Sequence, residues 1–295
     1  MTDIERLIRT DPAIRKPRDD EIDIHGLTHP GKVRAVNEDN FFIGSLHRRI
    51  AIQSTSLPDT SRLAKPGERL AFLAMVADGV GGAAMGEEAS RLAVEWATRF
   101  VADSMGCYYA FDASDDAGFT AALQEAALRT HATIVAEAEA DPDRRGMATT
   151  LTLWLGVWPR AYLLQVGDSR YYMLRQGQLH QVSRDQTMAE ELVAQGILTR
   201  KDAAGSRWAH VLSSAIGGRS TAPVVTGMDH HWGDVSLLCS DGLTKHVPDH
   251  RIRERLATMT SAKQVAEALL QDALDGGGTD NVTIIVGRAV RKDRG

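Results

Sequence analysis

The sequence has few of the residues that mark several common classes of protein. Its 295 residues include only two cysteines, Cys107 and Cys239, which match no zinc-binding or redox spacing. Cys239 lies in the apolar run VSLLCS and is interpreted as a small core residue rather than a nucleophile. No apolar run reaches the roughly eighteen residues that a membrane-spanning helix needs, so no membrane association is expected.

The chain also lacks a large excess of either charge. Its formal net charge is −5, which provides no overall basic field for nucleic acid, so no nucleic-acid partner is expected. With 43% hydrophobic and 25% charged residues, the composition is typical of a globular protein with a substantial core. The first twenty residues are charged and contain no apolar signal-peptide core, which predicts a cytoplasmic location.

Apolar patterning predicts one folded domain over residues 22–290, between a charged, flexible leader over 1–21 and a tail over 291–295. The predicted strands cover residues 23–29, 41–45, 71–77, 149–156, 160–167, 170–179, 235–240 and 281–290. The predicted helices lie near residues 89–100, 116–140, 187–196 and 261–277, and a polar insertion covers 45–69. Because strands come in clusters with tight turns, the pattern favours an α+β fold with mostly antiparallel sheets.

Carboxylates stand at the ends of several predicted strands. Asp78, Asp168 and Asp241 each end an apolar run, whereas Asp39 and Asp280 each precede one. In an antiparallel sheet the end of one strand lies beside the start of its neighbour, so all five acids can meet at one edge. Unpaired, they would repel one another, and a divalent cation would relieve that repulsion. Oxygen ligands without His or Cys suit Mg²⁺ or Mn²⁺.

The dipeptides that these aspartates form with the next residue also have a simpler interpretation. Asp-Gly and Asp-Asn are common in turns, so any one of them alone favours a turn, and only the set of five favours a metal site. The stretch DGVGG after Ala77 is not a phosphate-binding loop, because no Gly-Lys-Ser/Thr follows it. Arg34, five residues before Asp39, could bind a phosphoryl group through its guanidinium or form an ion pair with Glu38.

Six short motifs occur along the chain in this order: RAVNEDN, VADGVGG, GMATTLTLWL, VGDSRYYML, CSDGLTKHV and GTDNVTIIV. In this order they resemble the PPM family, the metal-dependent serine/threonine protein phosphatases of the 2C type, in its bacterial form. The resemblance covers about residues 24–286. It implies two stacked antiparallel β-sheets flanked by helices, a four-layer αββα sandwich with the metal centre at one end.

The resemblance also implies roles for individual residues. Two Mn²⁺ or Mg²⁺ ions would be bridged by Asp78, and a water between them would attack phosphorus directly, without a phosphoenzyme. Arg34 would bind the substrate phosphate and, with Asp78, Asp241 and Asp280, form the catalytic set. A weaker third ion would lie near Asp168 and Asp241. The implied metal-binding residues are Glu38, Asp39, Asp78, Gly79, Asp168, Asp241 and Asp280.

Two residues depart from the family pattern. Val80 stands where many eukaryotic members have a His proposed as the general acid, so another group must protonate the leaving group. Lys245 stands four residues after Asp241, where an Asp is common, and this puts the third metal site in question. The segment 187–217 resembles the flap of the family, which would shape access of the substrate.

The favoured function is therefore hydrolysis of phosphoserine and phosphothreonine in proteins, reversing a serine/threonine kinase in signal transduction. The expected partners are phosphorylated proteins and a cognate kinase, and the expected state is a monomer. Two alternatives stay open: a catalytically silent relative that binds or regulates, and a hydrolase of small phosphoesters. The choice between Mn²⁺ and Mg²⁺ also stays open.

Overall fold

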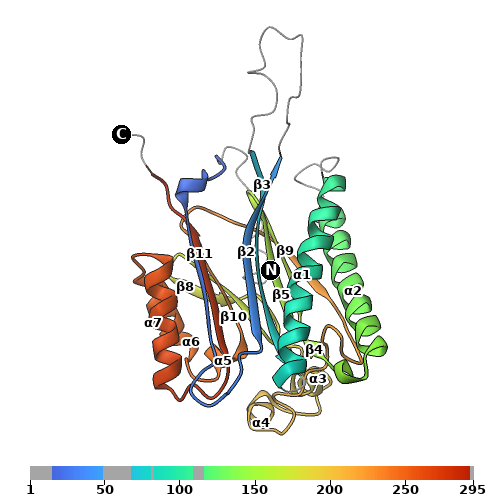
Figure 1. Ribbon diagram of the computed structural model, residues 1–295. Coiled ribbons are helices and arrows are strands. Elements are labelled where there is room, and N and C mark those ends of the chain that lie inside the picture. The colour runs from blue at the N-terminus through green and yellow to red at the C-terminus, as the bar shows by residue number, and fades with distance from the viewer. Residues whose placement is uncertain (1–14, 49–67, 81–82, 109–115, 293–295) are drawn as a thin grey trace, which may run out of the picture.

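Two β-sheets form the middle of the protein, and neighbouring strands in both are antiparallel (Figure 1). The computed structural model describes residues 15–48, 68–80, 83–108 and 116–292. The first sheet has the order β1 (Ile22–His29), β11 (Val282–Ala289), β10 (Val235–Cys239), β7 (Arg170–Arg175) and β8 (Gln178–Gln181). The second has the order β2 (Asp39–Arg48), β3 (Glu68–Val80), β5 (Leu151–Val157), β6 (Arg160–Val166) and β9 (Val224–Asp229), with β4 (Ala148–Thr149) beside β3.

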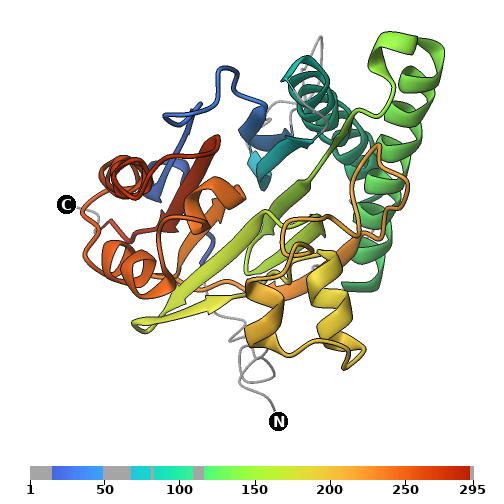
Figure 2. The same cartoon turned by 90° about the horizontal axis from the view of Figure 1, so that it is seen from below.

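Helices cover the outer face of each sheet. The second sheet is covered by α1 (Ala83–Tyr108) and α2 (Asp116–Ala140), and the first by α6 (Asp249–Ala257) and α7 (Ala262–Asp275). Three shorter helices, α3 (Met188–Ala194), α4 (Arg200–Ala204) and α5 (Asp241–Thr244), lie toward the lower end of Figure 1, and short 3₁₀ turns cover Asp19–Glu21 and Pro142–Arg144. Figure 2 shows the helix pairs on opposite sides of the two sheets, so the predicted four-layer αββα sandwich is confirmed. No helix in the described part of the chain is both long and apolar enough to cross a bilayer.

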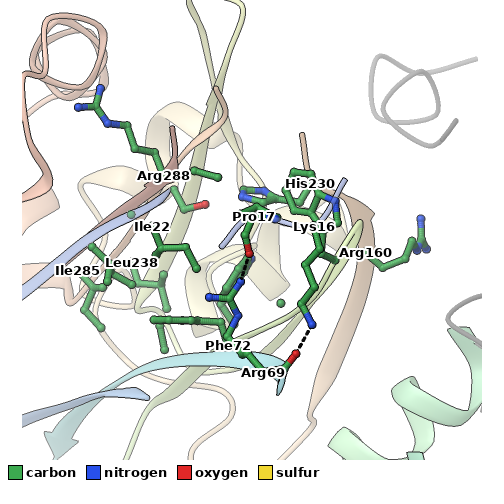
Figure 3. Close-up of a pocket in the computed structure, with 18 residues that line it drawn as sticks. Lys16, Pro17, Ile22, Arg69, Phe72, Arg160, His230, Leu238, Ile285 and Arg288 are labelled. Carbon is green, nitrogen blue, oxygen red and sulfur yellow. Dashed lines mark hydrogen bonds between the residues drawn. The ribbon is translucent and has the colours of Figure 1, made fainter. Parts of the chain in front are cut away.

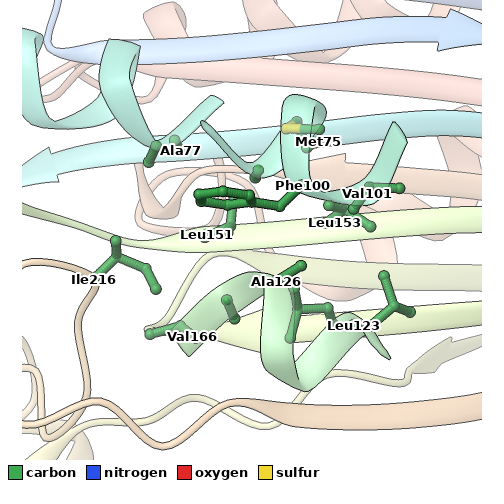
Figure 4. Close-up of a cluster of buried hydrophobic side chains, with 14 of the residues drawn as sticks. Met75, Ala77, Phe100, Val101, Leu123, Ala126, Leu151, Leu153, Val166 and Ile216 are labelled. Carbon is green, nitrogen blue, oxygen red and sulfur yellow. The ribbon is translucent and has the colours of Figure 1, made fainter. Parts of the chain in front are cut away.

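The spacing of apolar residues explains why the helices form where they do. On α2, Phe119, Leu123, Ala127 and Ile134 are all buried, as their helical spacing predicts. They pack with α1 against β5 and β6, where Figure 4 shows side chains such as Leu153 between the helices and the sheet. This apolar layer holds the second sheet to its helices.

The layer between the two sheets is apolar as well. Val76, Leu163, Leu238 and Ile285 meet there from both sheets. At the start of β3 this layer contains a small cavity of about 70 Å³, shown in Figure 3. The Arg69 guanidinium donates to the Pro17 carbonyl at 2.5 Å, and the Lys16 ammonium donates to the Arg69 carbonyl. Asp78 lies toward the opposite end of the same strand.

Three local predictions need correction. Residues 15–21, placed in a flexible leader, instead pack on the fold: Glu21 is buried and its carboxylate accepts from Arg15 at 2.7 Å. Residues 1–14 and 49–67, the rest of the leader and most of the predicted insertion, lie outside the described residues. Strand β3 continues through Asp78 to Val80 because it pairs with β2 and β4 there, so Asp78 lies inside a strand. The helices α4, α5 and α6 and the strand β9 were not predicted from the sequence.

We predict that Leu153→Ala lowers the free energy of unfolding by about 2–5 kcal/mol, because Leu153 is fully buried between β5 and the helices. Urea unfolding followed by circular dichroism measures this change. Leu128→Ala is the matched control: Leu128 is 48% exposed on α2, so its truncation should cost less than about 0.5 kcal/mol. An equal loss of unfolding free energy in the two variants would contradict the packing of Leu153 against the helices.

Candidate active site

The predicted carboxylates gather at one end of the sandwich. Asp39 on β2 pairs in register with Asp78 on β3 in the second sheet. In the first sheet, β10 ends at Cys239 just before Asp241, and the adjacent β11 begins just after Asp280. Asp168 precedes β7, the other neighbour of β10. A cleft of about 670 Å³ opens at this end and is lined by the following predicted site residues: Arg34, Glu38, Asp78, Gly79, Asp168, Asp241 and Asp280.

Asp39 lies behind the cleft and connects the two sheets. Its Oδ2 accepts a hydrogen bond of 2.7 Å from the Thr283 hydroxyl on β11. The Thr283 amide in turn donates to the Ser240 hydroxyl at 2.9 Å, next to Asp241. The second oxygen of Asp39, Oδ1, is buried without a hydrogen-bond partner in the described structure. Asp39 Oδ1 therefore lacks the hydrogen-bond donor or cation that a buried carboxylate oxygen requires.

Glycine lets helix α1 begin directly against this end of β3. A Cβ atom on Gly79 would lie 2.2 Å from the Gly86 carbonyl oxygen, and one on Gly86 would lie 2.2 Å from Glu38 Oε2. The contact at Gly79 is with backbone that cannot move away, so this position requires glycine, whereas a side chain at Gly86 would displace the Glu38 carboxylate. The close approach brings the Glu38 carboxylate to the start of α1 and beside Gly79. The glycines that looked like a turn in the sequence thus position the helix against the site.

Asn281 fixes the loop that carries Arg34. Its Nδ2 donates to the carbonyls of Pro30 at 3.1 Å and Val36 at 2.9 Å, and its Oδ1 accepts from the Glu38 amide at 2.8 Å. The side chain is buried. Asn281 was not among the site residues predicted from the sequence. Its position after Asp280 was the only signal, because its partners lie about 245 residues earlier in the chain.

Two cations hold the carboxylates of the first sheet. Arg34 approaches Asp280 with Nε 2.8 Å from Oδ1 and Nη2 3.1 Å from Oδ2. The Lys245 ammonium lies 2.6 Å from Asp241 Oδ2 and 2.7 Å from Asp280 Oδ2. Arg34, for which the sequence left an ion pair with Glu38 open, pairs with Asp280, and the Glu38 charge adds to its electrostatic stabilisation. Lys245 was noted in the sequence as a departure, but its two partners were not predicted.

The pKa values of these carboxylates differ according to their burial and the charges beside them. Burial, and then the neighbouring Asp39 and Asp241, raise the pKa of Asp78 well above its usual range. Burial also raises the pKa of Asp39 and that of Asp168 to about 7 each, and the Asp241 carboxylate adds to both shifts. For Asp280, burial is outweighed by Lys245 and Arg34, which lower its pKa. Negative charge is therefore least compensated around Asp78.

The other wall of the cleft comes from the segment after α4. The residues that line it are His210, Val211, Leu212, Ser213, Ser214, Ala215, Gly218, Arg219 and Ser220. Backbone pairs between Thr149 and Ile216, and between Thr187 and Leu212, tie this segment to β4 and to the start of α3. A second cleft of about 380 Å³ adjoins the first and shares Asp168 and Asp241 with it. This wall is part of the segment that resembled a flap in the sequence, and only its start was predicted as a helix.

Comparison with known proteins identifies relatives of this chain. Residues 54–276 match the family model described as protein phosphatase 2C. The serine/threonine protein phosphatase PstP of Mycobacterium tuberculosis is 35% identical over 266 residues, which is 90% of this chain and 44% of PstP. The chain thus spans less than half the length of that relative. The serine/threonine phosphatase stp of Listeria innocua is 30% identical over 215 residues, which is 72% of this chain and 83% of stp.

A solved structure has the same architecture. The catalytic domain of the serine/threonine protein phosphatase PstP, in complex with two manganese ions, is 32% identical to this chain in sequence. It superposes with a TM-score of 0.69 and covers 92% of this chain and 99% of that domain.

We predict that Asn281→Ala lowers the free energy of unfolding by about 1–3 kcal/mol, because two carbonyls and one amide, all in part-buried hydrogen bonds, lose their partner. Amide hydrogen exchange should also become faster in the loop over residues 30–38. Chemical unfolding and mass-spectrometric exchange measure the two effects. The control, Gln271→Ala, removes an exposed amide on α7 and should change neither. A loop that exchanges at the wild-type rate in Asn281→Ala would show that Asn281 does not anchor it.

Proposed function

Because the chain belongs to the protein phosphatase 2C family, we propose that it hydrolyses phosphoserine and phosphothreonine esters in proteins. The observation that carries this proposal is the cleft in which Arg34 and buried, mutually repelling carboxylates of both sheets face one solvent-filled space. A phosphate ester is an anion, and the carboxylates of this cleft outnumber the side-chain cations that line it. Added divalent cations would reverse this excess of negative charge, and carboxylates are the ligands that hard divalent cations prefer.

Two divalent ions, Mn²⁺ or Mg²⁺, are the cofactors in this proposal, as in the PstP domain that was solved with two manganese ions. Among the described residues, no three side chains are already arranged as a metal-binding group, because Asp241 and Asp280 are turned onto Lys245 and Arg34. The donors nevertheless fit such ions: all are oxygens, Asp39 Oδ1 is buried without a partner, and Asp78 is crowded by other carboxylates.

In the proposed assignment, the ions would be held by Asp78, the Gly79 carbonyl, Asp241 and Asp280, with Glu38 and Asp39 supporting them. When bound, such ions lower the pKa of water and neutralise charge that develops on a phosphoryl group. The chain itself contributes a closed apolar layer behind Asp39 and fixed strand ends, which keep the carboxylates from moving apart.

Arg34 is the proposed phosphate-binding residue. Its side chain is 52% exposed at the cleft, and Asn281 holds the loop that carries it. The guanidinium already forms a two-point contact with the Asp280 carboxylate, the geometry that also suits two phosphoryl oxygens. Once a metal ion engages Asp280, Arg34 is free to turn to the substrate. Val80, 41% exposed at the same cleft, has no proton to donate, whereas His210 lines the cleft with a titratable ring.

The physiological part of the proposal rests on this chemistry. A phosphatase of this type requires phosphorylated proteins as substrates and a serine/threonine kinase that makes them, so a role in signal transduction is proposed with it. A monomeric state and a cytoplasmic location stay predictions from the sequence.

We predict that Asp78→Ala lowers the Mn²⁺-dependent kcat/KM on a phosphothreonine peptide by at least about a thousandfold, because the cleft loses its central carboxylate. The variant should stay folded in chelator, because a buried carboxylate among like charges is removed. Asp103→Ala, an exposed position on α1, serves as the control with unchanged kinetics. Hydrolysis that survives in Asp78→Ala would contradict the assignment, and an inactive wild type in both metals would favour a silent binding module. Faster hydrolysis of free nucleotides than of phosphopeptides would favour a small-molecule phosphatase.

A second prediction concerns Arg34. Arg34→Lys keeps the charge but loses the two-point contact, so KM for the phosphopeptide should rise by about tenfold with a smaller change in kcat. Steady-state kinetics at saturating Mn²⁺ measure both constants. The exposed Arg145→Lys is the control, and an unchanged KM in Arg34→Lys would place phosphate binding elsewhere.

A further inference from the structure

Lys245 has an unusual position for a lysine. It follows α5 and lies one helical turn after Asp241, so its side chain lies beside the Asp241 carboxylate. Its ammonium contacts Asp241 and Asp280 at 2.6 and 2.7 Å, and only 25% of the side chain is exposed. The same side chain lines both the main cleft and the adjoining cleft, each of which also contains Asp168. Lys245 thus lies among the three carboxylates of the first sheet.

The ammonium already acts as a bound cation would. Together with Arg34 it pairs with the Asp280 carboxylate, and it also pairs with Asp241. Two carboxylates of the proposed metal centre therefore already face a fixed positive charge. Arg34, the other cation here, is expected to turn to substrate, whereas Lys245 is held by two carboxylates within its own end of the sheet.

Counting charge shows what this lysine replaces. Six carboxylates surround the cleft: Glu38, Asp39, Asp78, Asp168, Asp241 and Asp280. Two divalent ions supply four positive charges and Lys245 supplies a fifth, so a charge of −1 remains before Arg34 and Arg219, which also line the cleft, are counted. With an aspartate at position 245, as is common in the family, the same count requires a third divalent ion. Exchanging aspartate for lysine changes the local charge by two, which is the charge of one such ion.

We propose that Lys245 is a resident cation of this centre, which takes the place of a third divalent ion beside Asp168 and Asp241. The chain therefore binds two ions, and the ammonium weakens the binding of the ion held by Asp241 and Asp280. This inference rests on the metal centre of the proposed function. It makes Lys245 a residue that sets how many ions the protein carries.

The test counts bound ions rather than activity. The full-length chain is stripped with chelator, dialysed against a series of free Mn²⁺ concentrations, and analysed for manganese per chain. Wild type should bind two ions, and Lys245→Asp should bind three. Lys245→Met should still bind two, with the weaker of them about tenfold tighter, because a nearby positive charge is gone. Lys263→Met, on the exposed face of α7, is the control and should match wild type.

Each outcome decides the proposal. A wild type that binds three ions, or a folded Lys245→Asp that still binds two, overturns it. If Lys245→Asp does not fold, Lys245→Met decides: affinities within twofold of wild type overturn the proposal, and a tightened ion supports it. A wild type that binds no Mn²⁺ contradicts the metal centre itself. A wild type that hydrolyses phosphopeptide with three bound ions leaves the phosphatase function standing and removes only the role of Lys245.

Discussion

Repulsion among buried carboxylates at one end of the two sheets is the constraint on which the rest of the site depends. Asp78 is surrounded by other acids, and both burial and their charge oppose its ionisation. A protein keeps such a cluster only when the remainder of the fold is stable enough to hold it together. Here three apolar layers supply that stability: one under each helix pair and one between the sheets.

The sandwich also explains why the cluster forms at only one end. Each sheet contributes part of it, and the bond from Thr283 to Asp39 joins the two parts across the inter-sheet layer. At the other end of β3, Lys16 and Arg69 form hydrogen bonds near a small cavity of about 70 Å³. Among the described residues the larger opening is therefore at the carboxylate end, which is the entrance for substrate and ions in the proposed function. The segment after α4 then forms the outer wall of that cleft.

Cations are the second requirement of this arrangement, and the chain supplies two of its own. Arg34 and Lys245 both contact Asp280, and although burial opposes this, together they lower its pKa. The proposed roles of Arg34 and Lys245 differ because the two side chains are held in different surroundings. Arg34 is on an exposed loop and can turn to an anionic ligand, whereas Lys245 is half-buried behind α5. In our proposals, phosphate binding and neutralisation of the centre are therefore assigned to two different residues.

The sequence by itself determined the features that depend on neighbouring residues. Apolar spacing located α2 and most strands, and acids next to apolar runs located the five aspartates, because both patterns are local. Only the tertiary structure decided which groups meet. It paired Asp39 with Asp78, anchored the Arg34 loop on Asn281, and turned Lys245 onto Asp280. Arg34 and Asp280 are 246 residues apart, and no local pattern records such a contact, since it arises only when two sheets bring their strand ends together.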